Sequence, residues 1–246
     1  MKRILPLLFV LAMTLVLAAC SNTDETEPNI SQSFLSEDRE VSNETQSTED
    51  SDSTQQMEDS NMNETKILVA YFSRPGENYS VGYIEKGNTH IVADMIAEQT
   101  GGDIFEIRTV TPYPDDYDEC VEIAEQEQNE NARPELDESV GDMKNYDVVF
   151  LGYPNWWGDM PMAVYTFLES YDFSGKTIVP FCTHEGSGLS STESSIAEIC
   201  SDAEVLEGLA IRGSVAQNSQ EEAKEAVVSW LSEAGFLGGD SSSTER

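Results

Sequence analysis

Short apolar segments alternate with helix-forming segments over most of the chain, and this alternation restricts the fold more than any other feature of the sequence. Apolar runs of five to eight residues bounded by polar loops are typical of strands that are buried on both faces. Five such βα units predict an α/β fold, a doubly wound parallel sheet with helices on both faces. The strands are predicted at 66–72, 103–107, 146–153, 177–183 and 204–210, and the helices at 89–100, 117–131, 160–171, 191–200 and 220–234.

The N-terminal residues 1–20 have the pattern of a secretion signal. Lys2 and Arg3 precede an uninterrupted apolar run that is too short for a spanning helix and has no stop-transfer charges after it. The segment from Leu17 to Cys20 resembles the bacterial lipobox, which implies cleavage before Cys20 and lipidation of that cysteine. We therefore expect the chain to be lipid-anchored at the outer face of the cytoplasmic membrane. The alternative is an ordinary cleaved signal in which Cys20 has no role.

Residues 21–65 are rich in Ser, Thr, Asn and acidic side chains, with thirteen acids against a single base, Arg39. A segment with so little apolar surface cannot offset the entropy lost on ordering, so it is predicted to be a disordered tether. The tail at 237–246 has a similar composition. The predicted domain is therefore the segment 66–236.

The chain carries a formal net charge of −34. Such an excess of carboxylates argues against nucleic-acid binding and against electrostatic docking on anionic lipids. It is compatible with a basic protein partner and equally with solubility alone.

Three loops of unusual composition follow the predicted strands, at residues 73–89, 154–159 and 184–188. The first leads into a helix N-terminus, where free amide groups and the helix dipole favour an anion such as phosphate. The second contains Trp156 and Trp157, which offer flat surfaces for stacking, and the third contains two glycines. Open α/β sheets bind ligands beyond the carboxyl ends of their strands. We therefore expect a ligand with a phosphate and a flat ring at these three loops. The alternatives are an ordinary strand–loop–helix connection and tryptophans that are buried in the core or at a partner interface.

Metal and hydrolase sites are not supported by the sequence. The cysteines show no Cys-x-x-Cys spacing, the two histidines lie far from any cysteine pair, and no Gly-x-Ser-x-Gly segment occurs. We therefore assign no metal ligand and no catalytic residue.

Residues 66–236 resemble the flavodoxin-like proteins, in particular a bacterial branch of that family. The resemblance rests on Tyr71-Phe72-Ser73 before the first loop, on the Gly-Tyr-Pro-Asn-Trp-Trp-Gly stretch at 152–158, and on Pro-Phe-Cys-Thr at 180–183 running into Gly-Ser-Gly at 186–188. It implies a sheet order of 2-1-3-4-5 and flavin mononucleotide (FMN) as a non-covalent cofactor.

The resemblance also implies roles for individual residues. Ser73, Arg74, Asn88 and Thr89 correspond to the phosphate site, Pro154, Asn155, Trp156, Trp157 and Gly158 to one side of the isoalloxazine, and Thr183, His184, Glu185, Gly186, Ser187 and Gly188 to its other edge. The chain departs from the family pattern by an insertion, Pro75 to Gly87, inside the phosphate loop. The insertion leaves open whether Arg74 reaches the phosphate and whether Tyr79 and Tyr83 cover the cofactor or pack the insertion.

Three functions follow from these features. The first is a membrane-anchored FMN electron carrier that serves redox partner proteins. The second is an NAD(P)H- or quinone-linked flavin oxidoreductase with His184 or Tyr153 beside the substrate. The third is a non-redox module that binds another ligand or a protein, since the same fold supports several functions.

Overall fold

The computed structural model describes residues 65–237. The predicted signal segment, the lipidation site Cys20, the tether and most of the predicted tail lie outside these residues. Within 65–237, no helix is both long and apolar enough to cross a membrane.

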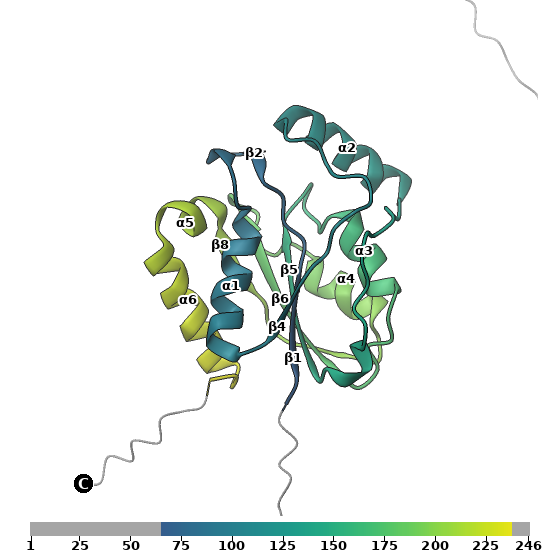
Figure 1. Ribbon diagram of the computed structural model, residues 1–246, viewed down its shortest axis with the longest axis vertical. Coiled ribbons are helices and arrows are strands. Elements are labelled where there is room, and N and C mark those ends of the chain that lie inside the picture. The colour runs from purple at the N-terminus through teal and green to yellow at the C-terminus, as the bar shows by residue number, and fades with distance from the viewer. Residues whose placement is uncertain (1–64, 238–246) are drawn as a thin grey trace, which may run out of the picture. The chain divides into compact units, whose positions relative to one another are not determined.

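A parallel sheet forms the centre of the described domain (Figure 1). Its order is β4-β1-β5-β6-β7, and β8 also pairs with β6. Numbered by predicted strand, this is the order 2-1-3-4-5, so the predicted α/β fold class and topology are confirmed. The strands are β1 (Ile67–Tyr71), β4 (Asp103–Glu106), β5 (Val148–Pro154), β6 (Thr177–His184), β7 (Glu204–Val205) and β8 (Leu209–Arg212).

The prediction of one continuous last strand at 204–210 is wrong, because the structure divides this segment into β7 and β8. The division lies beside Pro180 in β6. The Ile178 carbonyl accepts a hydrogen bond from the Leu206 amide at 3.0 Å. Pro180 lies two residues further along β6, so its backbone is directed toward the same neighbouring strand. Proline has no N–H group, and it therefore cannot continue the ladder toward the last strand.

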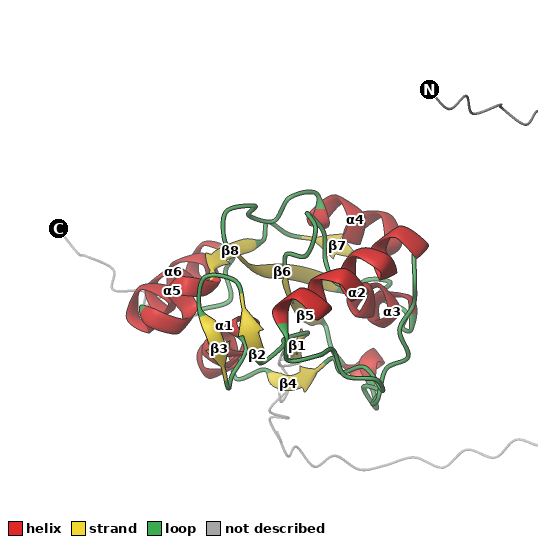
Figure 2. Cartoon of the chain, turned by 90° about the horizontal axis from the view of Figure 1, so that it is seen from above, coloured by secondary structure: helices red, strands yellow, loops and turns green. Residues whose placement is uncertain are grey.

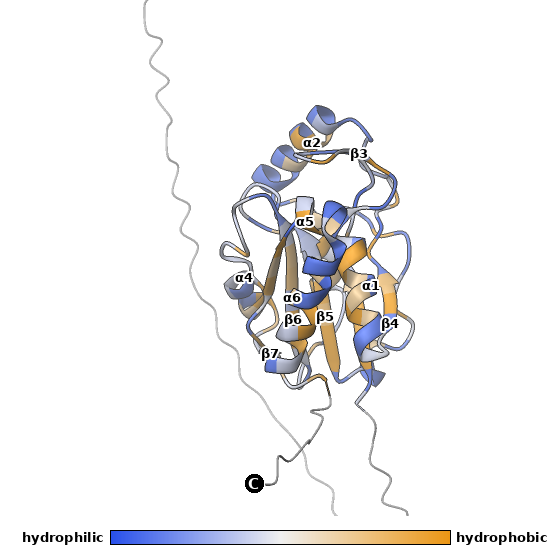
Figure 3. Ribbon diagram, turned by 90° about the vertical axis from the view of Figure 1, so that its left-hand side faces the viewer, coloured by the Kyte–Doolittle hydropathy of each residue, from blue (hydrophilic) through white to orange (hydrophobic). Residues whose placement is uncertain are grey.

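Helices cover both faces of the sheet. Side chains alternate along β1, so that Val69 and Tyr71 face a cluster with α1, α5 and α6, whereas Leu68 and Ala70 face a cluster with α3 and α4. Figure 3 shows the strands β5 and β6 in the orange of hydrophobic residues, whereas the helices around them carry both blue and orange residues. The helices are α1 (Asn88–Thr100), α2 (Tyr117–Glu130), α3 (Met162–Glu169), α4 (Thr192–Ile199), α5 (Gly213–Asn218) and α6 (Gln220–Glu233), with a 3-10 turn at Met143–Asn145.

The insertion after β1 folds into an antiparallel hairpin, β2 (Gly76–Asn78) and β3 (Gly82–Ile84). The hairpin and α2 lie at the end of the molecule where the strands of the sheet reach their carboxyl ends (Figure 1, Figure 2). Helix α2 buries only Cys120 and Ala124, and its first turn is capped by Asp116, which accepts a hydrogen bond from the Glu119 amide at 2.9 Å. The hairpin and α2 thus cover the edge at which ligands of parallel sheets bind.

Candidate functional site

The N-terminus of α1 lies directly against the end of β6. Thr89 and Thr183 are buried, and their hydroxyl oxygens are 2.8 Å apart. Ser73, which follows β1, accepts a hydrogen bond from the His90 amide at 3.1 Å, and its own O–H group is left able to donate. The structure therefore brings predicted phosphate residues from the first loop together with the end of the β6 strand.

Two features make the start of α1 a candidate ligand site. Its first turn carries no acidic residue, as is also the case in α3 and α5, whereas α2, α4 and α6 have acidic residues there. The positive end of the α1 dipole is therefore not neutralised by the helix itself. In addition, the side-chain oxygen Oδ1 of Asn88 is buried and has no hydrogen-bond partner in the described part of the chain. A buried polar atom without a partner is costly, and a bound group that donates a hydrogen bond there removes that cost.

The tryptophan loop contains a tight turn. The backbones of Trp156 and Asp159 exchange two hydrogen bonds, of 2.8 and 3.0 Å, across Trp157 and Gly158. Both central residues have positive φ angles, 54° for Trp157 and 80° for Gly158, which is the geometry of a type I′ turn. The Asn155 side chain accepts a further hydrogen bond from the Gly158 amide at 3.1 Å.

The two indole rings have different environments. Trp156 packs edge-on against Phe72 and Tyr113, with ring centroids 5.3 and 5.1 Å away. Trp157 is 52% exposed, and its Nε1 donates to the Val121 carbonyl of α2 at 3.3 Å. Trp156 is therefore held in an aromatic cluster, while Trp157 lies across α2.

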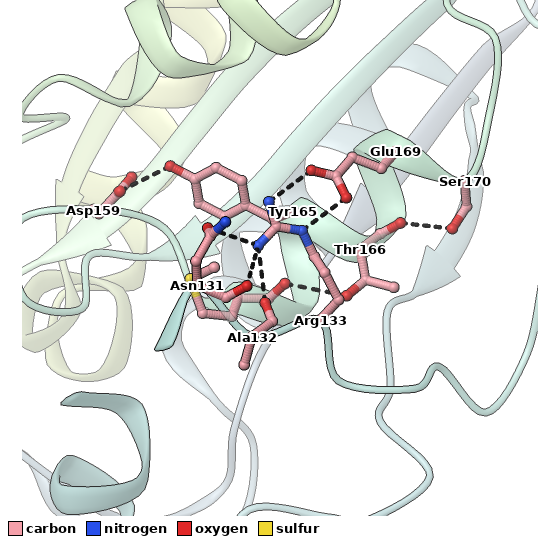
Figure 4. A network of polar contacts seen from close by, with 9 residues as sticks. Asn131, Ala132, Arg133, Asp159, Tyr165, Thr166, Glu169 and Ser170 are labelled. Atoms are coloured by element: carbon pink, nitrogen blue, oxygen red, sulfur yellow. Dashed lines mark hydrogen bonds and ion pairs between the residues drawn. The ribbon is translucent and has the colours of Figure 1, made fainter. Parts of the chain in front are cut away.

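A polar network connects the tryptophan turn to α3 (Figure 4). Tyr165 of α3 donates from its hydroxyl to Asp159 at 2.8 Å, and burial together with this bond raises the pKa of Tyr165 to about 12. The Arg133 guanidinium lies over the Tyr165 ring, 5.0 Å from its centroid, and donates to both carboxylate oxygens of Glu169. This network fastens the end of α2 and the tryptophan turn to the same helix, α3.

Asn155 joins the second and third loops. Its amide nitrogen Nδ2 donates to the Gly188 carbonyl at 3.0 Å and to the Ser190 hydroxyl at 2.9 Å, while its backbone amide donates to the Thr183 carbonyl at 2.8 Å. Asn155 therefore holds one loop against the other in addition to facing the cavity described below.

In the third loop, His184 accepts a hydrogen bond at Nδ1 from the Gly186 amide at 2.8 Å. Burial, and after it the nearby Arg212 guanidinium, hold the pKa of His184 below its ordinary value, so the imidazole is neutral at pH 7. The Glu185 carboxylate accepts hydrogen bonds from the amide and hydroxyl of Ser214, at 2.6 and 3.1 Å, at the start of α5. Glu185 thus stabilises the neighbouring helix as well as bordering the cavity.

A cavity of about 340 Å³ lies where the three loops meet. Three further residues line it: Asn78 and Tyr79 from the hairpin, and Tyr117 from the start of α2. The sequence had singled out Tyr79 with its role left open, whereas Asn78 and Tyr117 were not anticipated. The predicted site residues that line the cavity are Asn88, Pro154, Asn155, Trp156, Thr183, His184, Glu185, Gly186 and Ser187.

Six predicted residues do not line this cavity: Ser73, Arg74, Thr89, Trp157, Gly158 and Gly188. Most of them hold its walls through the contacts described above. Arg74 differs, because its guanidinium donates to the backbone carbonyls of Pro114, Asp115 and Glu77. The geometry therefore gives no support to Arg74 as a phosphate ligand.

A second cavity, of about 300 Å³, adjoins the first and shares Asn78, Tyr117, Asn155 and Trp156 with it. Its remaining wall comes from Arg74, Trp157 and one face of α2.

No group of three His, Cys, Asp or Glu side chains within 65–237 is arranged to hold a metal ion.

The flavodoxin family model matches residues 66–230, which is most of the described domain. The chain belongs to the flavodoxin family. A comparison with curated proteins gave no match.

Several solved structures are similar to the chain. A protein of Bacteroides eggerthii described as a flavoprotein is 29% identical, with a TM-score of 0.56 over 69% of this chain and 97% of that one. A flavoprotein of Bacteroides uniformis is 28% identical, with a TM-score of 0.55 over 68% of this chain and 98% of that one. A flavoprotein of Lactobacillus acidophilus, solved in complex with FMN, is 23% identical over 64% of this chain and 99% of that one, with a TM-score of 0.48.

We predict that Gly158→Val destabilises this flavodoxin-family domain, because the turn requires a positive φ at that position. A residue with a Cβ in this conformation costs about 1–2 kcal/mol, and a β-branched one costs more. Gly141→Val is the matched control, since a Cβ at Gly141 meets open space without a positive φ. Urea unfolding of both variants measures the difference, and equal losses of stability would contradict the assigned turn.

We also predict that stability falls as the pH drops below about 6.5, because the unfolded chain then binds a proton that folded His184 resists. His184→Asn keeps an acceptor for the Gly186 amide and removes one titration, so it should weaken this dependence. Burial, and after it the nearby Lys86, also lower the pKa of His90, the only other histidine of the chain, so His90→Asn should remove a second part and the double variant should flatten the dependence. An NMR titration should place the His184 midpoint below 6.5, and a midpoint above that value would show the assigned environment to be wrong.

Proposed function

We propose that the domain binds FMN non-covalently in the cavity at the carboxyl ends of β1, β5 and β6, and that it transfers electrons. The observation that carries this proposal is the convergence of the acid-free start of α1, the tryptophan turn and the 184–188 loop on one cavity. Family membership supports FMN as the cofactor. The unpartnered Asn88 oxygen fits this ligand, because FMN carries ribityl hydroxyl groups that donate hydrogen bonds.

Different residues of the chain would contact the phosphate and the ring of such a ligand. Ser73, whose hydroxyl is free to donate, would hold the phosphate together with the amides of the first turn of α1, while buried Thr89 keeps that turn against β6. Pro154, Asn155 and Trp156 border the ring on one side, and His184 to Ser187 border it on the other. The bound flavin supplies the redox chemistry, while the protein excludes water and sets the electrostatic environment.

We further propose that the protein is an electron carrier anchored through lipidated Cys20 at the outer face of the cytoplasmic membrane. The signal-like segment 1–20 and the lipobox-like sequence support the anchor. The acidic tether then extends the domain from the membrane toward redox partner proteins, because like charges along a flexible chain repel.

Titration with FMN tests the cofactor proposal. We expect FMN to quench tryptophan emission and to bind more tightly than riboflavin, which lacks the phosphate. Ser73→Ala should weaken FMN binding by about tenfold, the loss of one hydrogen bond to a charged group, and should leave riboflavin binding unchanged. Ser201→Ala, at an exposed position, is the control. A protein that remains colourless with unchanged emission in excess FMN would refute the proposal.

An NAD(P)H- or quinone-linked oxidoreductase is the second candidate function. The observation that favours it is the second cavity beside the first, because an enzyme needs room for a substrate next to its cofactor. A carrier needs no such site.

Steady-state assays separate the two candidates. As a carrier, the FMN-loaded protein should not oxidise NADH or NADPH in the presence of a soluble quinone. FMN-loaded protein that is reduced chemically should instead pass its electrons to a redox protein in a single turnover. Sustained turnover with NAD(P)H and quinone would overturn the carrier assignment in favour of the enzyme.

A further inference from the structure

The Arg74 guanidinium joins two segments that are far apart in the sequence. Its Nη1 donates to the carbonyl oxygens of Pro114 at 2.6 Å and Asp115 at 3.1 Å, just before α2, and its Nη2 donates to Glu77 in β2. The side chain is only 7% exposed. A buried cation needs hydrogen-bond acceptors, and here all three acceptors are backbone carbonyls of the hairpin and of the approach to α2.

Other contacts between the same two segments are equally close. The Glu77 amide donates to the Asp115 carbonyl at 2.8 Å. Gly76 has a φ of +86°, and a Cβ at that position would come within 2.8 Å of the Asp115 backbone, so glycine permits the approach. Beyond this junction, the rings of Tyr79 and Tyr117 stack with centroids 6.2 Å apart.

We propose that Arg74 is a positioning residue that clamps hairpin β2–β3 to the segment before α2, so that Asn78, Tyr79 and Tyr117 form one wall of the cofactor cavity. The insertion thereby becomes part of the flavin site. The flavin as occupant rests on the proposed function, whereas the clamp itself does not.

The direction of the side chain separates this role from phosphate binding. Arg74 borders the second cavity and does not line the cavity that contains Asn88 and the third loop. Its Nη groups are occupied by carbonyls of two different segments. A planar guanidinium can bridge two such segments, but a lysine ammonium is a point donor and reaches one.

The test compares Arg74→Met, Arg74→Lys and the control Arg108→Met, whose side chain is half exposed and pairs with Glu138 at 3.1 Å. Hydrogen exchange is measured without added flavin over residues 76–84 and 114–121. The affinities for FMN and riboflavin are then measured separately. If Arg74→Met does not fold, the same measurements on Arg74→Lys test the inference, because lysine keeps the positive charge and lacks the planar guanidinium group.

We expect exchange in both segments to be about tenfold or more faster in Arg74→Met, less so in Arg74→Lys, and unchanged in Arg108→Met. FMN and riboflavin affinities should fall by the same factor, because the wall contacts the ring and not the phosphate. Unchanged exchange, or a loss confined to FMN, would overturn the inference. If the unaltered protein binds no flavin, the proposed function fails, and the exchange data alone still decide whether Arg74 is the clamp.

Discussion

The hydrogen bond between Thr89 and Thr183 is the interaction on which the rest of the site depends. It joins the start of α1 to the end of β6, 94 residues apart, in a position that water does not reach. Leaving either hydroxyl without a partner there costs about 1–3 kcal/mol, so the two elements are held at one separation. That separation fixes the distance between the start of α1 and the loop that follows β6.

Loops on protein surfaces are ordinarily mobile, but those of this site are held by side chains that bond to backbone groups. Asn155 binds the carbonyl of Gly188, Glu185 binds the amide of Ser214, and Asp159 is held by Tyr165. The first bond ties two loops to each other, and the other two tie a loop to α5 and to α3. The walls are therefore organised before a ligand arrives, which reduces the entropy that binding must overcome.

The sequence predicts the regular part of the fold well, because buried parallel strands are apolar throughout and alternate with helices. The division of the last strand depends on Pro180, a signal that was present in the sequence but lies in the neighbouring strand. The hairpin was not predicted, since its strands have three residues each and no apolar alternation. Its position depends on bonds from Arg74 to backbone carbonyls, which every residue possesses and which no sequence pattern marks.

The three loops were predicted from composition at the strand ends and their individual residues from the resemblance, and most residues of the second and third loops border one cavity. Neither signal could separate residues that line the cavity from residues that hold the loops. Glu185 and Asn155 do both, and Arg74 contacts backbone of the insertion instead. The anchor at Cys20 lies outside the described residues and stays a prediction.

The charge distribution gives the cavity two unlike ends. The start of α1 offers a dipole without acidic residues, which stabilises a phosphate group. Helix α2, whose first residue Tyr117 borders the cavity, carries six acidic residues and no basic one. Like-charge repulsion from this helix opposes added negative charge on a bound ring, and this lowers the reduction potential of a flavin held there. Under the proposed function, this charge distribution stabilises the phosphate end of FMN and disfavours negative charge on its reduced ring.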